Sequence, residues 1–325
     1  MNYIVTGAGG YVGFAVVNEL LARGIVPRCL VNSGKTKKQL EALGASVFSG
    51  DITRIETLHD IFNVEGEIGV IHAAALISVG RKMTDWLYTV NVLGTKNIIE
   101  KCMEKSAALS YIGSIEAAEH TEGVMLRPAY NPDAVKGGYA KSKAMAAELV
   151  LDAAKRGLRG CILLPCAVFG PYDYRKGPVS QYFPLYLKHR YLPFIKGGYE
   201  IVDNRDIAFA AVEALAKGKP GESYILSNKW CEMKDILNLM RQQKGMPKIK
   251  VLLPTWLVKT AAAVSEPFVR LMRKEPVFTA FTISCINRRK TYSYKLAADD
   301  LGYSPCPIEQ TAKDMLRFYE DEGWI

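Results

Sequence analysis

A tyrosine and a lysine lie one helical turn apart in the segment Tyr139-Ala140-Lys141-Ser142-Lys143. Their i, i+4 spacing would place the phenol of Tyr139 and the ammonium of Lys143 on one face of a helix. The pKa of a free phenol is about 10, and a neighbouring cation lowers such a value by about 1–3. We therefore expect Tyr139 to exchange a proton with a carbonyl or an alcohol near neutral pH.

The same spacing recurs at Tyr172 and Lys176. That pair lies between Gly170-Pro171 and Gly177-Pro178, in a segment predicted to be a loop that cannot hold two side chains in rigid helical register. Tyr139, by contrast, is followed by an alanine-rich segment with helical periodicity. We therefore interpret the first pair as functional and the second as coincidence.

Ser114 follows the apolar run Tyr111-Ile112-Gly113, at the carboxyl end of a predicted strand. Its hydroxyl could hydrogen-bond a substrate oxygen there, although serine is also a common helix N-cap. The presence of Tyr139 and Lys143 favours the catalytic interpretation. Together the three residues suit hydride transfer, in which a cofactor carries the chemistry while the protein positions a carbonyl and supplies a proton.

Three glycines follow the first predicted strand at intervals of three residues, Gly7, Gly10 and Gly13. Gly7 permits a tight turn, Gly10 lets the main chain approach a pyrophosphate, and Gly13 allows close packing of helix and strand. The N–H groups of the helix start, around Tyr11 and Val12, would then hold the phosphates. An ordinary glycine-rich turn is the alternative, and the position at a strand–helix junction favours a dinucleotide site.

The end of the second predicted strand bears on which dinucleotide binds. Where a carboxylate would accept a hydrogen bond from the ribose 2′-hydroxyl of NAD, this chain has Asn32 and Ser33, followed by Lys35, Lys37 and Lys38. A charge-assisted hydrogen bond to a 2′-phosphate is worth about 1.5–3 kcal/mol. The sequence thus predicts a preference for NADP(H), with NAD(H) as the second choice. The alternative is that the lysines only form the solvated start of a helix.

Two further strand ends could contact the cofactor. Asp51, next to Ile52, can accept a hydrogen bond from the adenine amino group, and the short side chains of Ala73, Ala74 and Ala75 let the main chain approach. His72 has apolar neighbours and no adjacent acid, so we interpret it as structural.

These residues are positioned by an alternation of short apolar runs and longer stretches with helical periodicity. Such alternation predicts an α/β fold, with a doubly wound parallel sheet of the Rossmann type covered by helices on both faces. The predicted strands are 3–6, 27–31, 45–48, 69–73, 109–112 and 160–164, and the predicted helices include 11–23, 85–105 and 140–155.

The alternation of predicted strands and helices becomes less regular after Gly170-Pro171, where prolines alternate with aromatic residues. We expect residues 1–170 to form a dinucleotide-binding domain and 171–325 a smaller, mostly helical substrate domain. A later strand near 222–228 is expected to return to the first domain.

Composition limits the class of protein. The 325 residues are 49% hydrophobic and 23% charged, which is typical of a globular chain and excludes disorder. The net charge of +9 permits an acidic partner but selects none, and the basic run Arg288-Arg289-Lys290 alone does not predict nucleic-acid binding. Seven cysteines without a CxxC pair indicate a reduced intracellular protein and no metal site.

The chain start carries no basic and apolar leader, so we expect a cytoplasmic protein. The apolar stretch Val251–Met272 is interrupted by prolines and charges, which favours a pair of amphipathic helices over a membrane span. Such helices could pack on the core, cover an apolar pocket or contact a membrane surface peripherally.

Across nearly its whole length the sequence resembles the extended short-chain dehydrogenase/reductase family. Within it, the chain is similar to the 3β-hydroxysteroid dehydrogenase branch and to dihydroflavonol-reductase-like proteins. The matching segments are TGAGGYVG at 6–13, VIHAAALISVG at 70–80, VNVLGTKNIIEKC at 90–102, YIGSIEAA at 111–118, YAKSK at 139–143, LLPCAVFGP at 163–171, VDNRDIA at 202–208 and LGYSP at 301–305.

The resemblance implies a catalytic set of Ser114, Tyr139 and Lys143, in which Lys143 also holds the nicotinamide ribose. It further implies that Asn91 supports the geometry of the active-site helix, and that Pro165, Cys166 and Val168 line the nicotinamide.

The leading interpretation is an oxidoreductase that interconverts a secondary alcohol and a ketone of a bulky apolar substrate, with a 3β-hydroxysteroid or 3-ketosteroid favoured. Reduction of a dihydroflavonol-like or aldehyde substrate is the second. Nucleotide-sugar epimerisation is disfavoured by Asn32, and a protein that only senses nicotinamide would typically lack the Tyr–Lys pair. Sugar dehydratases of the family carry Thr-Asp-Glu where this chain has Ser114-Ile115-Glu116, which leaves dehydration without an acid. A homodimer is compatible with the resemblance.

Overall fold

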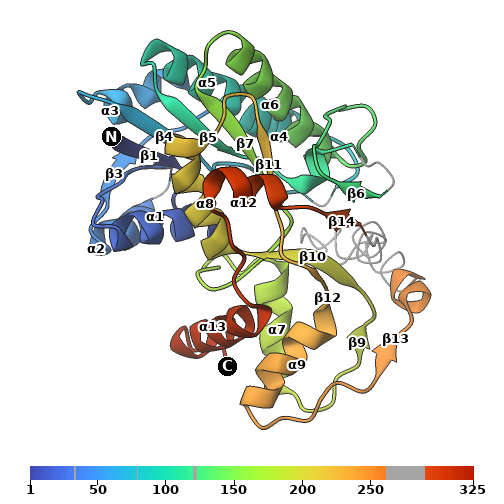
Figure 1. Cartoon of the computed structure of the whole chain (residues 1–325). Coiled ribbons are helices and arrows are strands. Elements are labelled where there is room, and N and C mark those ends of the chain that lie inside the picture. Colours follow the sequence, from blue (N-terminus) through green and yellow to red (C-terminus); the bar gives the residue numbers. More distant parts are fainter. Residues whose placement is uncertain (33, 79, 120–122, 261–289) are drawn as a thin grey trace. The chain divides into compact units, whose positions relative to one another are not determined.

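The computed structural model describes residues 1–32, 34–78, 80–119, 123–260 and 290–325, and the chain divides into two compact units (Figure 1). The chain passes between the units several times, so neither is one continuous segment. The first unit comprises Met1–Cys166, Asn204–Ser227 and Tyr292–Ser304; the second comprises Ala167–Asp203, Asn228–Thr291 and Pro305–Ile325.

A seven-stranded sheet forms the centre of the first unit, and all its neighbouring strands are parallel. The strand order is β11-β7-β5-β4-β1-β2-β3. The winding reverses between β1 and β4, which is where ligands of doubly wound sheets bind. The strands are β1 (Asn2–Thr6), β2 (Arg28–Val31), β3 (Ser46–Ser49), β4 (Ile68–His72), β5 (Ala108–Ile112), β7 (Gly160–Pro165) and β11 (Ser223–Leu226).

Helices cover this sheet in two groups, which Figure 1 shows on opposite faces. In one group α8 contacts α1 and α12 and packs on β4, β5 and β7; in the other α5 contacts α6, and both pack on the sheet. The predicted doubly wound α/β fold is therefore confirmed. The remaining elements of the unit are α1 (Tyr11–Ala22), α2 (Gly34–Ala42), η1 (Ile55–Leu58), α3 (His59–Phe62), α4 (Asp85–Tyr88), η2 (Thr89–Leu93), α5 (Gly94–Glu104), η3 (Ile115–Ala117), β6 (Val124–Met125), α6 (Gly138–Lys155), α8 (Asn204–Lys217) and α12 (Lys295–Leu301), and β14 (Thr291–Tyr292) lies at the boundary between the units.

The helix predicted over 85–105 contains a turn of π-helix, η2, between α4 and α5. The spacing of apolar residues predicts a helix here. It does not reveal the one-residue insertion that a π turn makes. Such turns are frequent at functional sites. Asn91 is buried in this one.

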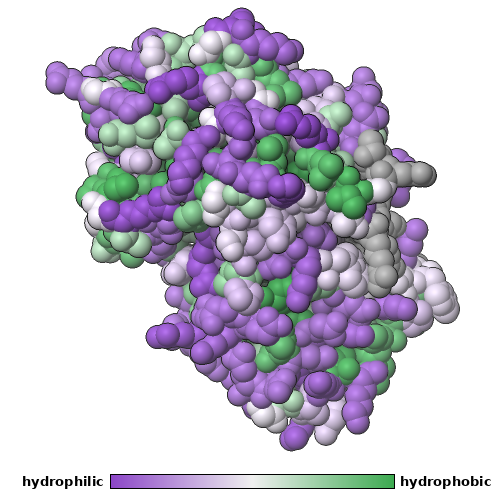
Figure 2. Space-filling model, in the orientation of Figure 1, coloured by the Kyte–Doolittle hydropathy of each residue, from purple (hydrophilic) through white to green (hydrophobic). Residues whose placement is uncertain are grey.

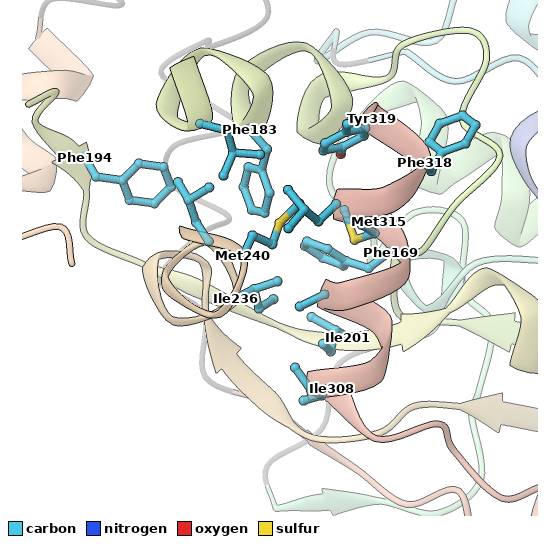
Figure 3. Packing of buried hydrophobic residues seen from close by; sticks show 14 residues of the cluster. Phe169, Phe183, Phe194, Ile201, Ile236, Met240, Ile308, Met315, Phe318 and Tyr319 are labelled. Atoms are coloured by element: carbon cyan, nitrogen blue, oxygen red, sulfur yellow. The ribbon is translucent and has the colours of Figure 1, made fainter. Parts of the chain in front are cut away.

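In its described residues the second unit holds the helices α7, α9 and α13, a helical segment at 255–260, and two small sheets with strand orders β12-β10-β8 and β13-β9. A hydrophobic core joins side chains from α7, α9, α13 and the strands β8 and β10 (Figure 3). The predicted helical character is present, and the small sheets were not predicted. The elements are β8 (Ala167–Phe169), α7 (Pro178–Lys188), β9 (Phe194–Ile195), β10 (Gly198–Asp203), β12 (Trp230–Glu232), α9 (Met233–Gln243), β13 (Leu252–Leu253) and α13 (Ile308–Asp321).

The face in Figure 2 is mainly hydrophilic, with smaller hydrophobic areas scattered over it. Within the described ranges, the chain has no helix long and apolar enough to cross a membrane. The amphipathic helix pair predicted within Val251–Met272 lies outside the described residues beyond Thr260, as do Ser33, Arg288 and Arg289.

Candidate active site

The glycine-rich turn connects β1 to α1 and has the geometry that a dinucleotide requires. Gly7 has φ +67°, a left-handed conformation that favours glycine, and a Cβ atom on it would lie 2.6 Å from the main chain of Ala74. A Cβ atom on Gly13 would lie 2.1 Å from the carbonyl oxygen of Gly7. These two glycines therefore bring the ends of β1 and β4 and the start of α1 together.

α1 begins at Tyr11, and the first main-chain N–H groups of a helix, here including those of Val12 and Gly13, have no acceptor within the helix. Gly10 precedes them in an extended conformation (φ −86°, ψ 171°) and, lacking a side chain, does not cover them. No acidic residue stands in the first turn. An anionic phosphate fits this positive helix end.

At the end of β2, Asn32 is exposed, and α2 begins two residues later. Lys37 lies on α2 with its Nζ 3.8 Å from Glu41, and Lys38 is exposed. Ser33 and the side chain of Lys35 lie outside what the structure describes. Two of the three lysines proposed for a 2′-phosphate thus lie on an exposed helix start.

At the end of β3, the carboxylate of Asp51 is oriented by Thr53, whose main-chain N and Oγ1 both donate to it, at 2.9 and 2.8 Å. Ile52 is buried and packs against Gly94, where an added Cβ would lie 2.6 Å from Ile52 Cδ1. Asp51 is therefore available as an acceptor, whereas the Ile52 side chain belongs to the core.

Ala73 and Ala74 follow β4, are partly buried and lie beside the glycine turn, since the main-chain N of Ala73 donates to the carbonyl oxygen of Thr6. Ala75 is exposed. Pro165 ends β7, and Cys166 is buried just after it.

Val168 belongs to β8 in the second unit and lines an apolar cavity there. Apart from Ser33 and the Lys35 side chain, which are not described, the other predicted cofactor residues belong to the first unit, at or after the carboxyl ends of its strands and on the helices that follow, whereas Val168 belongs to the second unit.

Asn91 ties three segments together from inside the π turn. Its Oδ1 accepts from the main-chain N of Leu76 at 2.7 Å, and its Nδ2 donates to the carbonyl oxygen of Leu76 and to Ser142 Oγ, each at 2.9 Å. Ser142 lies on α6, between Tyr139 and Lys143. Asn91 thus joins α6 to the loop after β4, and the role that the resemblance implies for it stays a prediction.

Tyr139 lies in the first turn of α6, which starts where Gly137 has φ +104° and Gly138 packs on the main chain of Lys82. Ser114 caps the short helix η3, because its Oγ accepts from the main-chain N of Glu116 at 3.3 Å. Its hydroxyl also hydrogen-bonds Tyr139. The helix-cap interpretation of this serine therefore agrees with the structure, and its hydrogen bond to a substrate oxygen stays a prediction.

The expectation that Lys143 lowers the pKa of Tyr139 is wrong for this structure. Burial of the Tyr139 phenol raises its pKa to about 12; the hydrogen bond with Ser114 opposes this rise, and the charge of Glu116 adds to it. Burial also lowers the pKa of Lys143 to about 7, so near neutral pH the lysine carries only part of its charge. The Tyr139 phenol is consequently protonated at neutral pH.

The Lys143 side chain is buried, with 3% of its surface exposed. Its Nζ donates to the carbonyl oxygen of Ile112 at 2.7 Å and to the hydroxyl of Tyr111 at 3.1 Å. Ile112 ends β5, two residues before Ser114. The structure therefore gathers Ser114, Tyr139 and Lys143 at the end of β5.

The second Tyr–Lys pair is not helical. Tyr172 has φ +76° and Lys176 φ +52°, and the ammonium of Lys176 lies 4.2 Å from the ring centroid of Trp324. His72 is buried, and its ring nitrogens face Thr6 Oγ1 at 2.6 Å and Thr95 Oγ1 at 3.1 Å. Burial lowers the pKa of His72 to about 3, so its imidazole is neutral and structural.

Some neighbours of the site were not predicted. Gly9 packs on Thr36 so closely that an added Cβ would lie 1.9 Å from Thr36 Cγ2, and Tyr111 contacts Lys143 directly. Gly9 is the fourth glycine of the turn and can be read from the sequence. Nothing in the sequence joins Tyr111 to Lys143, because they lie 32 positions apart on different elements.

Comparison with known proteins agrees with this geometry. The model of the NAD dependent epimerase/dehydratase family matches residues 3–227. A putative dihydroflavonol 4-reductase of Synechocystis is 28% identical over 332 residues, covering 99% of this chain and 96% of that protein. Human 3 beta-hydroxysteroid dehydrogenase type 7 is 28% identical over 350 residues, covering 93% and 91%. The crystal structure of gox2253 has a TM-score of 0.82 and 27% identity, covering 100% of this chain and 99% of that one.

The matched residues contain the glycine turn, the ends of β4 and β5, and helix α6, which are the parts of the chain that carry the site. The chain therefore belongs to the NAD dependent epimerase/dehydratase family, and it is an NAD(P)-dependent oxidoreductase with the extended short-chain dehydrogenase/reductase fold.

Proposed function

We propose that this enzyme interconverts a secondary alcohol and a ketone on a bulky apolar substrate, and that the substrate is a 3β-hydroxysteroid or the corresponding 3-ketosteroid. The observation that carries the proposal is the meeting of Ser114, Tyr139 and Lys143 at the end of β5, on the sheet whose β1 leads into the glycine turn. The 28% identity to human 3 beta-hydroxysteroid dehydrogenase type 7 supports the substrate class.

The cofactor would be held by the glycine turn, the start of α1 and Asp51, and it supplies or accepts the hydride. Ser114 hydrogen-bonds the substrate oxygen, and Tyr139 gives its proton to that oxygen during reduction or takes it during oxidation. Because burial raises the pKa of Tyr139 to about 12, the phenol holds its proton at neutral pH. The phenol can therefore supply a proton during reduction, and oxidation requires loss of that proton first.

The second unit contains an apolar cavity of about 280 Å³, which we propose as a binding place for an apolar ligand. This volume is close to the lower end of the range of about 300–1,000 Å³ that is typical of ligand sites. Among the aromatic residues that follow position 171, Phe183 and Phe194 are mostly core, while Tyr182, Tyr186 and Tyr199 are only partly buried and can contact a ligand. A lining made almost wholly of apolar and aromatic side chains suits rings better than sugars.

NADP(H) is the proposed preferred cofactor, because Asn32 replaces the carboxylate that would repel a 2′-phosphate. Lys38, exposed on α2, could reach such a phosphate, and Lys37 would have to leave Glu41 to do so. NAD(H) remains the second choice. Peripheral membrane contact and a homodimer also stay predictions.

Reduction of a dihydroflavonol-like substrate is the second candidate, favoured by the 28% identity to the Synechocystis protein. The same residues would carry out that reaction. A panel of steroid, flavonoid and aldehyde substrates, each assayed with NADPH and NADH by the change in nicotinamide absorbance, separates the two candidates.

The mechanism is tested by Tyr139→Phe, which keeps the ring and removes the proton. We expect kcat to fall by about 10²- to 10⁴-fold with every accepted substrate, while cofactor binding is retained. Tyr172→Phe is the matched control, since it removes a phenol from the non-helical pair, and it should keep turnover. Substantial turnover by Tyr139→Phe would refute the assignment.

A further inference from the structure

A polar chain runs through the core of the first unit from Lys143 to β1. The Lys143 ammonium donates to Tyr111 Oη and lies 4.6 Å from the Tyr111 ring centroid. Tyr111 in turn hydrogen-bonds Thr95, whose Oγ1 also faces His72 Nε2. The other ring nitrogen of His72, Nδ1, faces Thr6 Oγ1 on β1 at 2.6 Å. Tyr111, Thr95, His72 and Thr6 are all buried.

The directions of the hydrogen bonds between these side chains follow from the main-chain acceptor of Thr95. Thr95 donates to the carbonyl oxygen of Asn91 at 2.7 Å, so Thr95 Oγ1 must accept from its other partners, Tyr111 and His72. The proton of the neutral imidazole is then on His72 Nε2, and Nδ1 accepts from the Thr6 hydroxyl. Because Tyr111 donates to Thr95, its oxygen has its lone pairs directed to the ammonium of Lys143.

Tyr111 thus offers Lys143 two contacts that favour a cation, a phenol oxygen and a ring face. Burial raises the pKa of Tyr111 well above its usual value, so it remains a neutral acceptor. Among the described residues, the ionisable groups that interact electrostatically with Lys143 or Tyr111 are His72 on β4, Tyr139 on α6 and Tyr130. None of these can supply an anion at neutral pH, since burial raises the pKa of both tyrosines and lowers that of His72.

We propose that Tyr111 is a positioning residue that holds the Lys143 ammonium at the end of β5, with Thr95 and His72 fixing the orientation of its hydroxyl. The importance of this contact for turnover rests on the proposed function, in which Lys143 acts beside Tyr139. The contact itself does not depend on that function.

Tyr111→Phe tests the proposal, because it keeps the ring under the ammonium and removes only the oxygen. We expect kcat to fall by about 10- to 100-fold, the effect of losing one hydrogen bond to a charged group, with the KM for substrate little changed. The alkaline limb of the pH–rate profile should move to lower pH, since the charged form of Lys143 loses an acceptor. A purely structural role would lower stability without changing kcat or the profile.

Tyr224→Phe is the matched control. Tyr224 is another fully buried tyrosine of the same sheet, on β11, and its hydroxyl donates to Asp300 at 3.1 Å, away from Lys143. This variant should keep the kcat and the pH profile of the wild type. If the wild type is active and Tyr111→Phe has an unchanged kcat and pH–rate profile, the proposed role of Tyr111 is refuted. The proposed function is not affected by that result.

A second readout does not need activity. Losing the acceptor penalises only the protonated lysine, so Tyr111→Phe should lower the urea midpoint of unfolding more at pH 6 than at pH 9. Tyr224→Phe should lower the urea midpoint of unfolding equally at pH 6 and at pH 9. If the wild type reduces no ketone, the proposed function fails, and this pH-dependent difference still decides whether Tyr111 holds the ammonium; an equal loss at both pH values would refute it.

Discussion

Lys143, a proposed catalytic residue, reduces the free energy of unfolding because its charged side chain is buried. Burial lowers its pKa to about 7 from the usual value near 10.5. Between these two pH values the unfolded chain binds more protons than the folded one, so the penalty is fully present below pH 7 and disappears as the pH rises toward 10.5. The two acceptors at Ile112 and Tyr111 offset only part of this penalty.

Lys143→Met is therefore expected to be inactive and yet more stable than the wild type at pH 6, by about 1–3 kcal/mol. The gain should shrink as the pH rises toward 10, because the wild-type lysine then becomes neutral in both states. Urea unfolding at a series of pH values measures this. Lys141→Met is the control: Lys141 is partly exposed and pairs with the exposed Asp133, so its loss should change stability by about 1 kcal/mol or less. A variant at 143 that is less stable than the wild type at pH 6 would contradict the argument.

At the scale of elements, the glycine turn joins β1, the end of β4 and α1 through contacts between main chains. A side chain on Gly13 has no room, since its Cβ would lie 2.1 Å from the carbonyl oxygen of Gly7 and 2.7 Å from its carbonyl carbon. These are main-chain atoms that cannot rotate away. Relief requires α1 to move away from the turn, and the N–H groups at its start would move with it.

Gly13→Ala should therefore weaken cofactor binding strongly, by tenfold or more, and destabilise the fold by about 1–3 kcal/mol. Titration of nicotinamide fluorescence and urea unfolding measure the two effects. Gly157→Ala separates them: Gly157 has φ +102° with nothing within 4 Å of an added Cβ, so it should lose about 1–2 kcal/mol through backbone strain and keep cofactor affinity. Equal cofactor affinity in Gly13→Ala and wild type would show that the turn does not bind the dinucleotide.

The elements also show which parts of the fold sequence could predict. Strands such as β4, β5 and β7 are buried on both faces, and their unbroken apolar runs predicted them to within a residue or two. Strands β9 and β13 have two residues each, too few for any pattern. The pairing of Tyr139 with Lys143 follows from helical periodicity, whereas the pKa of each depends on burial among segments far apart in the chain, such as Tyr111 and Ile112.

On the scale of the whole molecule, the proposed function assigns different tasks to the two units. The glycine turn and Ser114, Tyr139 and Lys143 belong to the first unit, and the apolar cavity belongs to the second. Substrate preference should therefore be changeable without changing cofactor binding. Ala167 on β8 is the smallest residue that lines the cavity, so a larger side chain there reduces the space for a ligand directly.

Ala167→Leu adds three carbon atoms to that wall. We expect kcat/KM for a ring ketone to fall by about tenfold or more, since a single methylene too many in a fitted pocket is worth about 1–3 kcal/mol. A small aldehyde should be reduced at an unchanged rate, and cofactor affinity should be unchanged because the glycine turn and Asp51 lie in the first unit. Leu185→Ala, an exposed position on α7, is the control and should affect neither substrate. If Ala167→Leu slowed large and small substrates alike, or weakened the cofactor, the cavity would not be the part of this enzyme that selects the substrate.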